Sequence, residues 1–265
     1  MKQVVYISML GEPSHYNIDS FKSLCDSGLE KDWVVEWFQS LAIEYGFSFI
    51  SVDICNGGEL PSVSSIDTVI VGGSNHDIRD AYPWLERLTC WLTEYRTLGR
   101  PLLAICASHQ LVSTIFEDGT LTEREGGLMA GSFAVKLSEL GQKHPLFEGI
   151  SKDPKFLFAN YLHVLPSNSL ANKALASIGE SSAICVDHGG YWYSCQFHPE
   201  SHKKTWECFF NENSDVDMDL YCGEHSGRQL IENFFKISKN AVVEQRAKPM
   251  AVHPVVSSTS SDSQP

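Results

Sequence analysis

Short apolar segments alternate with segments of helical period in the N-terminal part of this chain, and the alternation limits the folds open to it. Residues 4–9 form an apolar run typical of a buried strand, and residues 33–45 place apolar side chains at helical spacing. The same patterns predict strands at 47–54, 68–71 and 102–105 and a helix at 83–98. Because parallel strands need crossover connections, this order predicts an α/β fold with an open, mostly parallel sheet and helices on both faces.

The pattern changes after Gly131. Short β-like segments follow at 133–137, 156–158, 174–178, 182–186 and 191–197. They predict the remaining strands of the sheet and a small antiparallel β addition. An amphipathic pattern at 228–237 predicts a closing helix, so residues 1–240 are expected to form one domain. Residues 241–265 are polar without a clear period, which predicts a disordered tail whose deletion leaves the melting temperature nearly unchanged.

Composition excludes several functions. The 20 basic and 33 acidic residues give a formal charge of −13, and no basic block stands out to bind a phosphate backbone, so no nucleic-acid partner is expected. No run approaches the ~18 apolar residues of a membrane span. The first apolar run soon meets Gly11 and Pro13, which predicts a strand and not a signal peptide. Eight cysteines without C-x-x-C spacing predict reduced thiols and a cytoplasmic protein.

Cys106 ends the apolar strand at 102–105 and precedes a predicted helix. A cysteine taken alone is more often a buried core residue than a nucleophile. A sharp strand-to-helix turn changes that expectation, because it places the thiol at the sheet edge, where the helix N-terminus stabilises a thiolate. Cys106 is therefore predicted to be a catalytic nucleophile, with the backbone N–H of Ala107 directed at an oxyanion.

A distant segment, residues 195–201, supplies the partners that such a thiol needs. It ends a β-like stretch on His198, and Glu200 follows two residues later. An imidazole accepts the thiol proton, and a carboxylate fixes its tautomer and orientation, so His198 is predicted to be the base and Glu200 its orienting group. Gly72 and Gly73 also follow a predicted strand, and glycine permits the close backbone approach required of a second oxyanion donor.

These segments resemble the class I glutamine amidotransferases, a family with a flavodoxin-like fold, and within it free-standing proteins similar to the amidotransferase domain of GMP synthetase. The resemblance covers about residues 1–240. Its most specific elements are the Cys106 turn with His109-Gln110, residues 196–200, and Val71-Gly72-Gly73-Ser74 followed by residues 80–85. It implies a Cys-His-Glu triad that attacks the side-chain amide of glutamine, forms a γ-glutamyl thioester, releases ammonia and then hydrolyses the thioester.

The chain departs from the family pattern at positions that concern the substrate. Ala104 and Ser108 replace two glycines of the family's Gly-x-Cys-x-Gly-x-Gln turn, and the Ser108 hydroxyl would narrow the pocket or add a hydrogen bond. The family's Ser-His-x-Asp/Glu segment has its nearest equivalent at 159–166, where the acidic residue is missing. The expected substrate-binding residues are Gln110, Ser108, Asn160, Tyr161 and His163. The substrate is either glutamine or a γ-glutamyl conjugate.

Residues 203–227 form an acidic segment longer than the link expected in the family. The pattern favours a solvated surface loop over the alternative, a lid or docking surface beside the site. No metal site is expected, because the acidic spacing at 215–219 lacks the Gly and Glu of an EF-hand and no cluster has zinc-site spacing. The sequence contains no G-x-x-x-x-G-K-[ST] phosphate loop, so no cofactor is expected and ATP-dependent amination would need a separate synthetase.

The leading hypothesis is cysteine-dependent hydrolysis of a γ-glutamyl amide, with release of ammonia or an amine, as a glutaminase or γ-glutamyl peptidase. The missing acidic residue and the absent synthetase slightly favour hydrolysis without a partner. Two alternatives stay open: an ammonia-supplying subunit of a separate synthetase, and a non-catalytic binding or regulatory protein on the same fold. The complete set of Cys106, His198 and Glu200 argues against the non-catalytic alternative.

Overall fold

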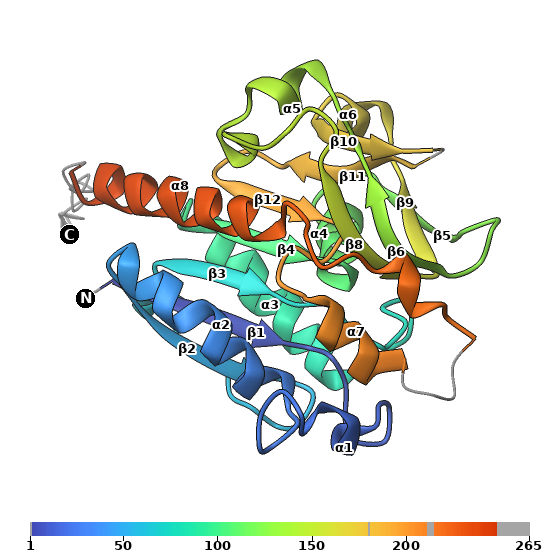
Figure 1. Cartoon of the computed structure of the whole chain (residues 1–265). Helices are drawn as coiled ribbons and strands as arrows, with labels where there is room; N and C mark the ends of the chain where they lie inside the picture. The colour runs from blue at the N-terminus through green and yellow to red at the C-terminus, as the bar shows by residue number, and fades with distance from the viewer. Residues whose placement is uncertain (1, 180, 211–214, 248–265) are drawn as a thin grey trace, which may run out of the picture.

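An eight-stranded sheet forms the centre of the protein (Figure 1). The structure is a computed structural model, and it describes residues 2–179, 181–210 and 215–247. In spatial order the strands are β2 (Phe47–Asp53), β1 (Lys2–Ser8), β3 (Thr68–Val71), β4 (Leu102–Ile105), β12 (Trp192–Cys195), β11 (Ser181–Asp187), β10 (Ala174–Ile178) and β7 (Lys136–Leu137). The pairs from β2 to β12 are parallel and those from β12 to β7 are antiparallel, which confirms the predicted mostly parallel sheet.

Two small antiparallel sheets make up the expected β addition. One pairs β5 (Thr120–Glu123) with β9 (Leu162–Leu165), and the other pairs β6 (Met129–Ala134) with β8 (Lys155–Asn160). The single strand expected at 133–137 is wrong, because the chain leaves β8 after Ala134 and pairs with β10 as β7. β5 and β9 were not predicted, since their mixed polar and apolar residues are not typical of a buried strand.

Helices cover both faces of the central sheet (Figure 1). The long ones are α2 (Glu30–Glu44), α3 (Pro83–Thr97), α4 (Ala107–Ile115) and α8 (Gly227–Ala247). Alternate residues of a strand point to opposite faces, so Val4 and Tyr6 pack in the core with α2 and α8, whereas Val5 and Ile7 pack with α3 and α4. The central parallel strands β3 and β4 are buried on both sides, which explains why their sequences are almost continuously apolar.

The remaining helices are short. They are α1 (Ile18–Phe21), α5 (Glu139–Lys143), α6 (Asn168–Ala171) and α7 (Lys203–Phe210), with single 3-10 turns at η1 (Val63–Ser65), η2 (Pro145–Phe147) and η3 (Met218–Leu220). The ends of α3 follow the sequence signals. Pro83 lies in its first turn, and Gly99, with φ of 61°, follows its end.

Helix α8 extends beyond the domain boundary expected at residue 240. It continues to Ala247, and Ala241 and Val242 are 1% and 2% exposed. Burying a valine contributes about 1.5–3 kcal/mol, so a deletion from residue 241 removes part of the core. Residues 248–265 of the expected tail lie outside the described residues.

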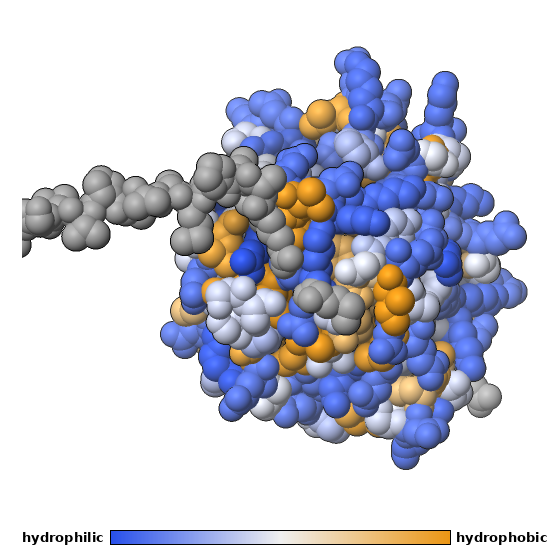
Figure 2. Space-filling model, turned by 90° about the vertical axis from the view of Figure 1, so that its left-hand side faces the viewer, coloured by the Kyte–Doolittle hydropathy of each residue, from blue (hydrophilic) through white to orange (hydrophobic). Residues whose placement is uncertain are grey.

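No described helix is long and apolar enough to cross a membrane. Figure 2 views the molecule from the side on which α8 ends, where hydrophobic groups lie among hydrophilic ones. Large exposed hydrophobic residues include Ile43 on α2 and Val243 on α8, which are 62% and 55% exposed.

Candidate active site

Three adjacent strands end at one edge of the sheet, and the residues that follow them meet there. β3, β4 and β12 are parallel neighbours, so their carboxyl ends lie side by side, where ligands bind in sheets of this kind. A Cβ atom added to Gly73 would lie 3.0 Å from Cε1 of His198 and 3.3 Å from Cβ of Cys106. Gly73 therefore lies against both side chains, although Cys106 and His198 are 92 residues apart in the sequence.

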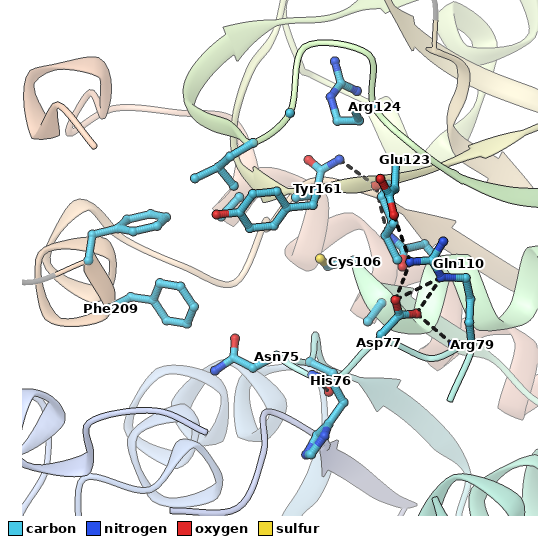
Figure 3. A pocket seen from close by; sticks show the side chains of 18 residues that line it. Asn75, His76, Asp77, Arg79, Cys106, Gln110, Glu123, Arg124, Tyr161 and Phe209 are labelled. Atoms are coloured by element: carbon cyan, nitrogen blue, oxygen red, sulfur yellow. Dashed lines mark hydrogen bonds and ion pairs between the residues drawn. The ribbon is translucent and has the colours of Figure 1, made fainter. Parts of the chain in front are cut away.

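Cys106 occupies a strained turn between β4 and α4. Its φ and ψ angles are 55° and −110°, and it is one of two non-glycine residues with positive φ in the described chain. A conformation of this kind costs on the order of 1–3 kcal/mol and persists only where the surroundings hold it. The side chain lies at the N-terminus of α4 and lines a cavity (Figure 3). The geometry is that of a nucleophile elbow.

Ser108 holds this turn in place. It is fully buried, and its hydroxyl donates to the carbonyl oxygens of Val71 and Ile105, at 2.8 and 2.9 Å, as alternative acceptors. The hydroxyl oxygen also accepts a bond of 2.6 Å from the N–H of Ile105. The Ser108 hydroxyl was expected either to narrow the pocket or to add a hydrogen bond. The added hydrogen bond is present, but it joins the end of β3 to the Cys106 turn. Ser108 is therefore part of the scaffold and does not line the cavity, contrary to the expected substrate contact.

His198 and Glu200 form a close pair beside the thiol. The Nδ1 atom of His198 lies 2.7 Å from Oε1 of Glu200, and both side chains are almost fully buried. The backbone N–H of His198 donates to Leu157 on β8, and the ring packs edge-on against Trp206. Because Glu200 engages Nδ1, the Nε2 atom is left to face Cys106, and no oxygen or nitrogen of the described residues bonds to it.

The surroundings of His198 favour its protonated form. Burial opposes the charge of the imidazolium, but the adjacent Cys106 and Glu200 outweigh burial, so the pKa of His198 is raised well above its usual value. An imidazole of this kind takes and keeps a proton beside a thiol. The arrangement suits a thiolate–imidazolium pair.

Only one of the two glycines has a backbone N–H available for an oxyanion. The N–H of Gly72 donates to the carbonyl of Ile7 at 3.0 Å, so the structure contradicts its predicted role as an oxyanion donor. Gly73 lies next to Cys106 instead. The N–H of Ala107 is at the first position of α4, where no carbonyl of the helix is available to it. Gly73 and Ala107 are thus the remaining candidates for the donor pair.

A chain of amide side chains leads to the sulfur. The Nε2 of Gln110 donates to the carbonyl of Leu162 and to Oε1 of Gln196, at 3.1 and 3.0 Å. Gln196 in turn directs its own Nε2 at the Cys106 sulfur, 3.6 Å away. An N–H group in this position stabilises a thiolate. Gln196 was noted in the sequence without a role, and its position one residue after β12 was the only available signal.

A cavity of about 520 Å³ opens beside Cys106 (Figure 3). Of the expected substrate-binding residues, Gln110, Asn160 and Tyr161 line this cavity. His163 does not line it, because its Nδ1 lies 2.8 Å from the hydroxyl of Ser181 behind β9. The cavity falls within the ~300–1,000 Å³ range of small-molecule sites.

Charged residues that the sequence did not single out line the far side of the cavity (Figure 3). They are Asp77, Arg79, Glu123 and Arg124. The guanidinium of Arg79 pairs with Asp77 through contacts of 2.9 and 2.5 Å and approaches Glu123 at 3.4 Å. Both signs of charge are therefore present on this side of the cavity.

The acidic 203–227 segment begins as a packed helix and not as a solvated loop. In α7, Trp206 and Phe210 are buried with Tyr221, whose hydroxyl donates to the carbonyl of Phe158 at 2.7 Å. Phe209 and Phe210 line the cavity. Aromatic residues at helical spacing give α7 a buried face. This part of the segment therefore borders the cavity, which is the position that the lid alternative requires. Residues 211–214 lie outside the described residues.

A second buried carboxyl group, Glu30, lies behind the triad. It is 4% exposed and accepts hydrogen bonds from Tyr6 and Ser8, at 2.9 and 2.6 Å. Burial is the main cause that raises its pKa to about 7, and the hydrogen bond from Ser8 opposes it while the charge of Glu200 adds to it. No pattern in the sequence singles out Glu30, because its burial depends on the packing of α2 against β1.

Glu30→Gln is expected to increase stability at pH 8 and to have little effect at pH 5. The folded-state pKa of Glu30 is raised from 4.5 to about 7. The contribution of protonated Glu30 to the free energy of unfolding is therefore complete below pH 4.5 and is lost as the pH rises through 7. That loss is on the order of 3 kcal/mol. Denaturant unfolding at the two pH values measures it. Glu36→Gln, at an exposed position of the same helix, should leave the pH dependence unchanged, and equal pH dependence of the Glu30→Gln and parent proteins would contradict the prediction.

The fold and this edge of the sheet define an α/β protein of the amidotransferase type. The family model for class I glutamine amidotransferases matches residues 41–216, which is more than half of the chain. The chain belongs to the class I glutamine amidotransferase family, which confirms the resemblance found in the sequence.

Relatives and solved structures agree with this assignment. Imidazole glycerol phosphate synthase subunit HisH of Methanosarcina barkeri is 27% identical over 175 residues, which cover 60% of this chain and 84% of that protein. The same subunit of Methanosarcina acetivorans is 29% identical over 182 residues, or 62% and 87% of the two chains. A glutamine amidotransferase from Thermotoga maritima has a TM-score of 0.63 at 15% identity, covers 92% and 98% of the two chains, and shows the shared fold.

Proposed function

We propose that this chain hydrolyses the side-chain amide of a γ-glutamyl substrate through a thioester on Cys106. The observation that carries the proposal is the contact of Cys106 and His198 around Gly73, with Glu200 2.7 Å from the far nitrogen of the imidazole. Nucleophile, base and orienting group thus stand in the order required of a triad. The cavity beside the thiol provides space for the substrate.

The geometry supports the following steps. The Cys106 thiolate, whose proton is held on Nε2 of His198, bonds to the amide carbon. The N–H groups of Gly73 and Ala107 bind the oxyanion that forms, and His198 returns the proton to the leaving nitrogen. Water then gives a proton to His198 and attacks the thioester, which releases glutamate and restores the Cys106 thiolate beside the His198 imidazolium. Gln196 stabilises the thiolate at the start and end of the cycle.

The first candidate substrate is glutamine, with ammonia delivered to a separate synthase. Both relatives compared above are named as subunits of a synthase, and each aligns over more than four fifths of its length. This similarity favours a partnered glutaminase over the hydrolase without a partner that the sequence slightly favoured. The partner would use the ammonia, since this sequence has no phosphate loop of its own.

The second candidate substrate is a γ-glutamyl conjugate, and the shape of the cavity favours it. The space of about 520 Å³ extends from Cys106 to Arg79 and Arg124 and has room for more than the glutamyl group. In that case a larger amine leaves in place of ammonia. The thioester chemistry is the same.

Glutamate and ammonia release, measured separately, distinguishes these functions. The purified chain is incubated with glutamine and with a panel of γ-glutamyl dipeptides. Equal amounts of glutamate and ammonia from glutamine identify the glutaminase, whereas glutamate without ammonia from a dipeptide identifies the peptidase. No product from any of these substrates, together with no modification of Cys106 by a glutamine-like chloroketone, would reject hydrolysis and favour the non-catalytic alternative.

A further inference from the structure

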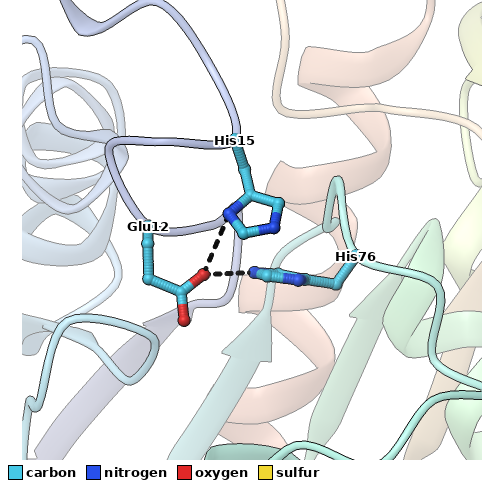
Figure 4. A group of neighbouring side chains, drawn as sticks. All are labelled: Glu12, His15 and His76. Carbon is cyan, nitrogen blue, oxygen red and sulfur yellow. Dashed lines mark ion pairs between the residues drawn. The ribbon is translucent and has the colours of Figure 1, made fainter.

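Glu12, His15 and His76 form a cluster on the side of the β3–α3 loop away from Cys106 (Figures 3 and 4). One nitrogen of each imidazole and one oxygen of Glu12 lie within 4.8 Å of one another. The shared oxygen, Oε2 of Glu12, is 3.3 Å from Nδ1 of His15 and 2.6 Å from Nε2 of His76. No step of the proposed γ-glutamyl hydrolysis uses these residues.

Two loops bring the cluster together. The N–H of His15 donates to the carbonyl of Glu12 at 2.8 Å, and this turn places both side chains on the same side. His76 comes from the loop after β3, which is tied to the first loop by the N–H of Asn75 donating to Leu10 at 2.8 Å. A Cβ atom on Gly11 would lie 3.2 Å from Cβ of His15 and 3.6 Å from Nε2 of His76, so the backbone lies directly beneath the two rings.

His76 is buried beside Glu12, and its pairing with that carboxylate is not an aligned hydrogen bond. It is 6% exposed, and neither ring nitrogen makes an aligned hydrogen bond to any described residue. Oε2 of Glu12 is close to Nε2 but also lacks an aligned hydrogen bond in the same part of the chain.

We propose that Glu12, His15 and His76 bind Zn²⁺, with a water molecule as the fourth ligand. Two imidazoles and one carboxylate are a common zinc ligand set, whereas Ca²⁺ and Mg²⁺ prefer oxygen ligands alone. Zinc–ligand bonds of ~2.0–2.1 Å in a tetrahedron place ligand atoms about 3.3 Å apart. The separation between Glu12 and His15 already has this value, and the partly exposed Glu12 can rotate to widen its separation from His76.

A zinc ion here would join the loop after β1 to the loop after β3. The second loop also carries Gly73 and Asn75, which border the Cys106 site. The metal would therefore restrain the backbone of the proposed oxyanion donor, and His76 also lines the cavity beside Cys106. The metal has a structural role beside the site.

Zn²⁺ titration of the Cys106→Ala protein by calorimetry tests the proposal, because this variant removes the thiol that would otherwise bind the metal. One site is expected. His15→Ala in that protein should weaken Zn²⁺ binding at least ~10- to 100-fold, because mutating even a residue that only hydrogen-bonds to a metal ligand lowers metal affinity by this factor. His144→Ala is the matched control, because His144 lies 3.3 Å from Asp187 in an ordinary His–carboxylate pair, and it should leave the affinity unchanged.

Co²⁺ provides a second readout that does not depend on enzymatic activity. The visible absorption of four-coordinate Co²⁺ should appear in the Cys106→Ala protein and disappear in the His15→Ala and Glu12→Gln versions of it. Both are partly or fully exposed positions, so these changes should not prevent folding. Absence of a Zn²⁺ site from the Cys106→Ala protein, or equal affinity in its His15→Ala and His144→Ala versions, would overturn the proposal.

Discussion

Replacing Cys106 by alanine or serine is expected to reduce γ-glutamyl hydrolysis by at least ~10⁴-fold, because single removals of a triad nucleophile have effects of this size or larger. Alanine removes the atom that forms the thioester. Serine keeps a hydroxyl in nearly the same place, but its alkoxide forms far less readily than a thiolate, and Gln196 and His198 are positioned for sulfur. Release of glutamate from glutamine under saturating conditions measures the loss.

The control for this experiment is Cys90→Ala. Cys90 is an exposed cysteine on α3 that does not line the cavity beside Cys106, and its loss should leave the rate unchanged. The melting temperature of the Cys106 variants should stay close to that of the parent protein, since alanine and serine keep the Cβ atom and therefore the same strained turn. Retention of more than about one hundredth of the activity in either Cys106 variant would reject the thioester mechanism.

The central strands were predictable because local sequence alone determines their character. β3, β4 and β10 have the expected bounds, since each is a short apolar run between turn-forming residues. The order of these runs with their helices also predicted the parallel sheet, and the sheet in turn predicted that Gly73 and Cys106 would share one edge. This part of the site follows from the topology.

Contacts made between loops were not predictable from the sequence. The N–H of Gly72 donates to the carbonyl of Ile7, and the hydroxyl of Ser108 donates to the carbonyl of Val71. Both hydrogen bonds depend on the register of β1, β3 and β4. The same limit explains why Glu30 was missed. Its environment depends on how α2 packs, and no periodicity in the sequence encodes a hydrogen bond to Tyr6.

The structure also changes the question of substrate recognition. The sequence showed only that the family's acidic residue is missing at 159–166. In the structure, Asp77 and Glu123 line the cavity from the β3–α3 loop and from β5, together with Arg79. Acidic groups are thus present at the cavity, but they come from other segments, and both interact with Arg79.

His198→Ala is expected to reduce hydrolysis by ~10³- to 10⁶-fold, and Glu200→Gln by ~10- to 100-fold less than that. The difference arises because His198 carries the proton in every step, whereas Glu200 acts through the imidazole. Gln can still accept a hydrogen bond from Nδ1, so it keeps the ring in place but removes the charge. Rates with glutamine for the two variants and the parent protein measure the ranking, and a larger loss in Glu200→Gln would contradict these roles.

The pH profile separates this positioning role from a merely structural one. Glu200 is one of the groups that raise the pKa of His198, so removing its charge should lower that pKa. The imidazolium is then lost at lower pH, and the alkaline limb of kcat/KM should move to lower pH in Glu200→Gln. A structural defect alone would lower the rate at all pH values and leave the limb in place. Because Glu200 also raises the pKa of Glu30, the same variant should make Glu30 ionise at lower pH, which couples the two buried carboxyl groups in one titration.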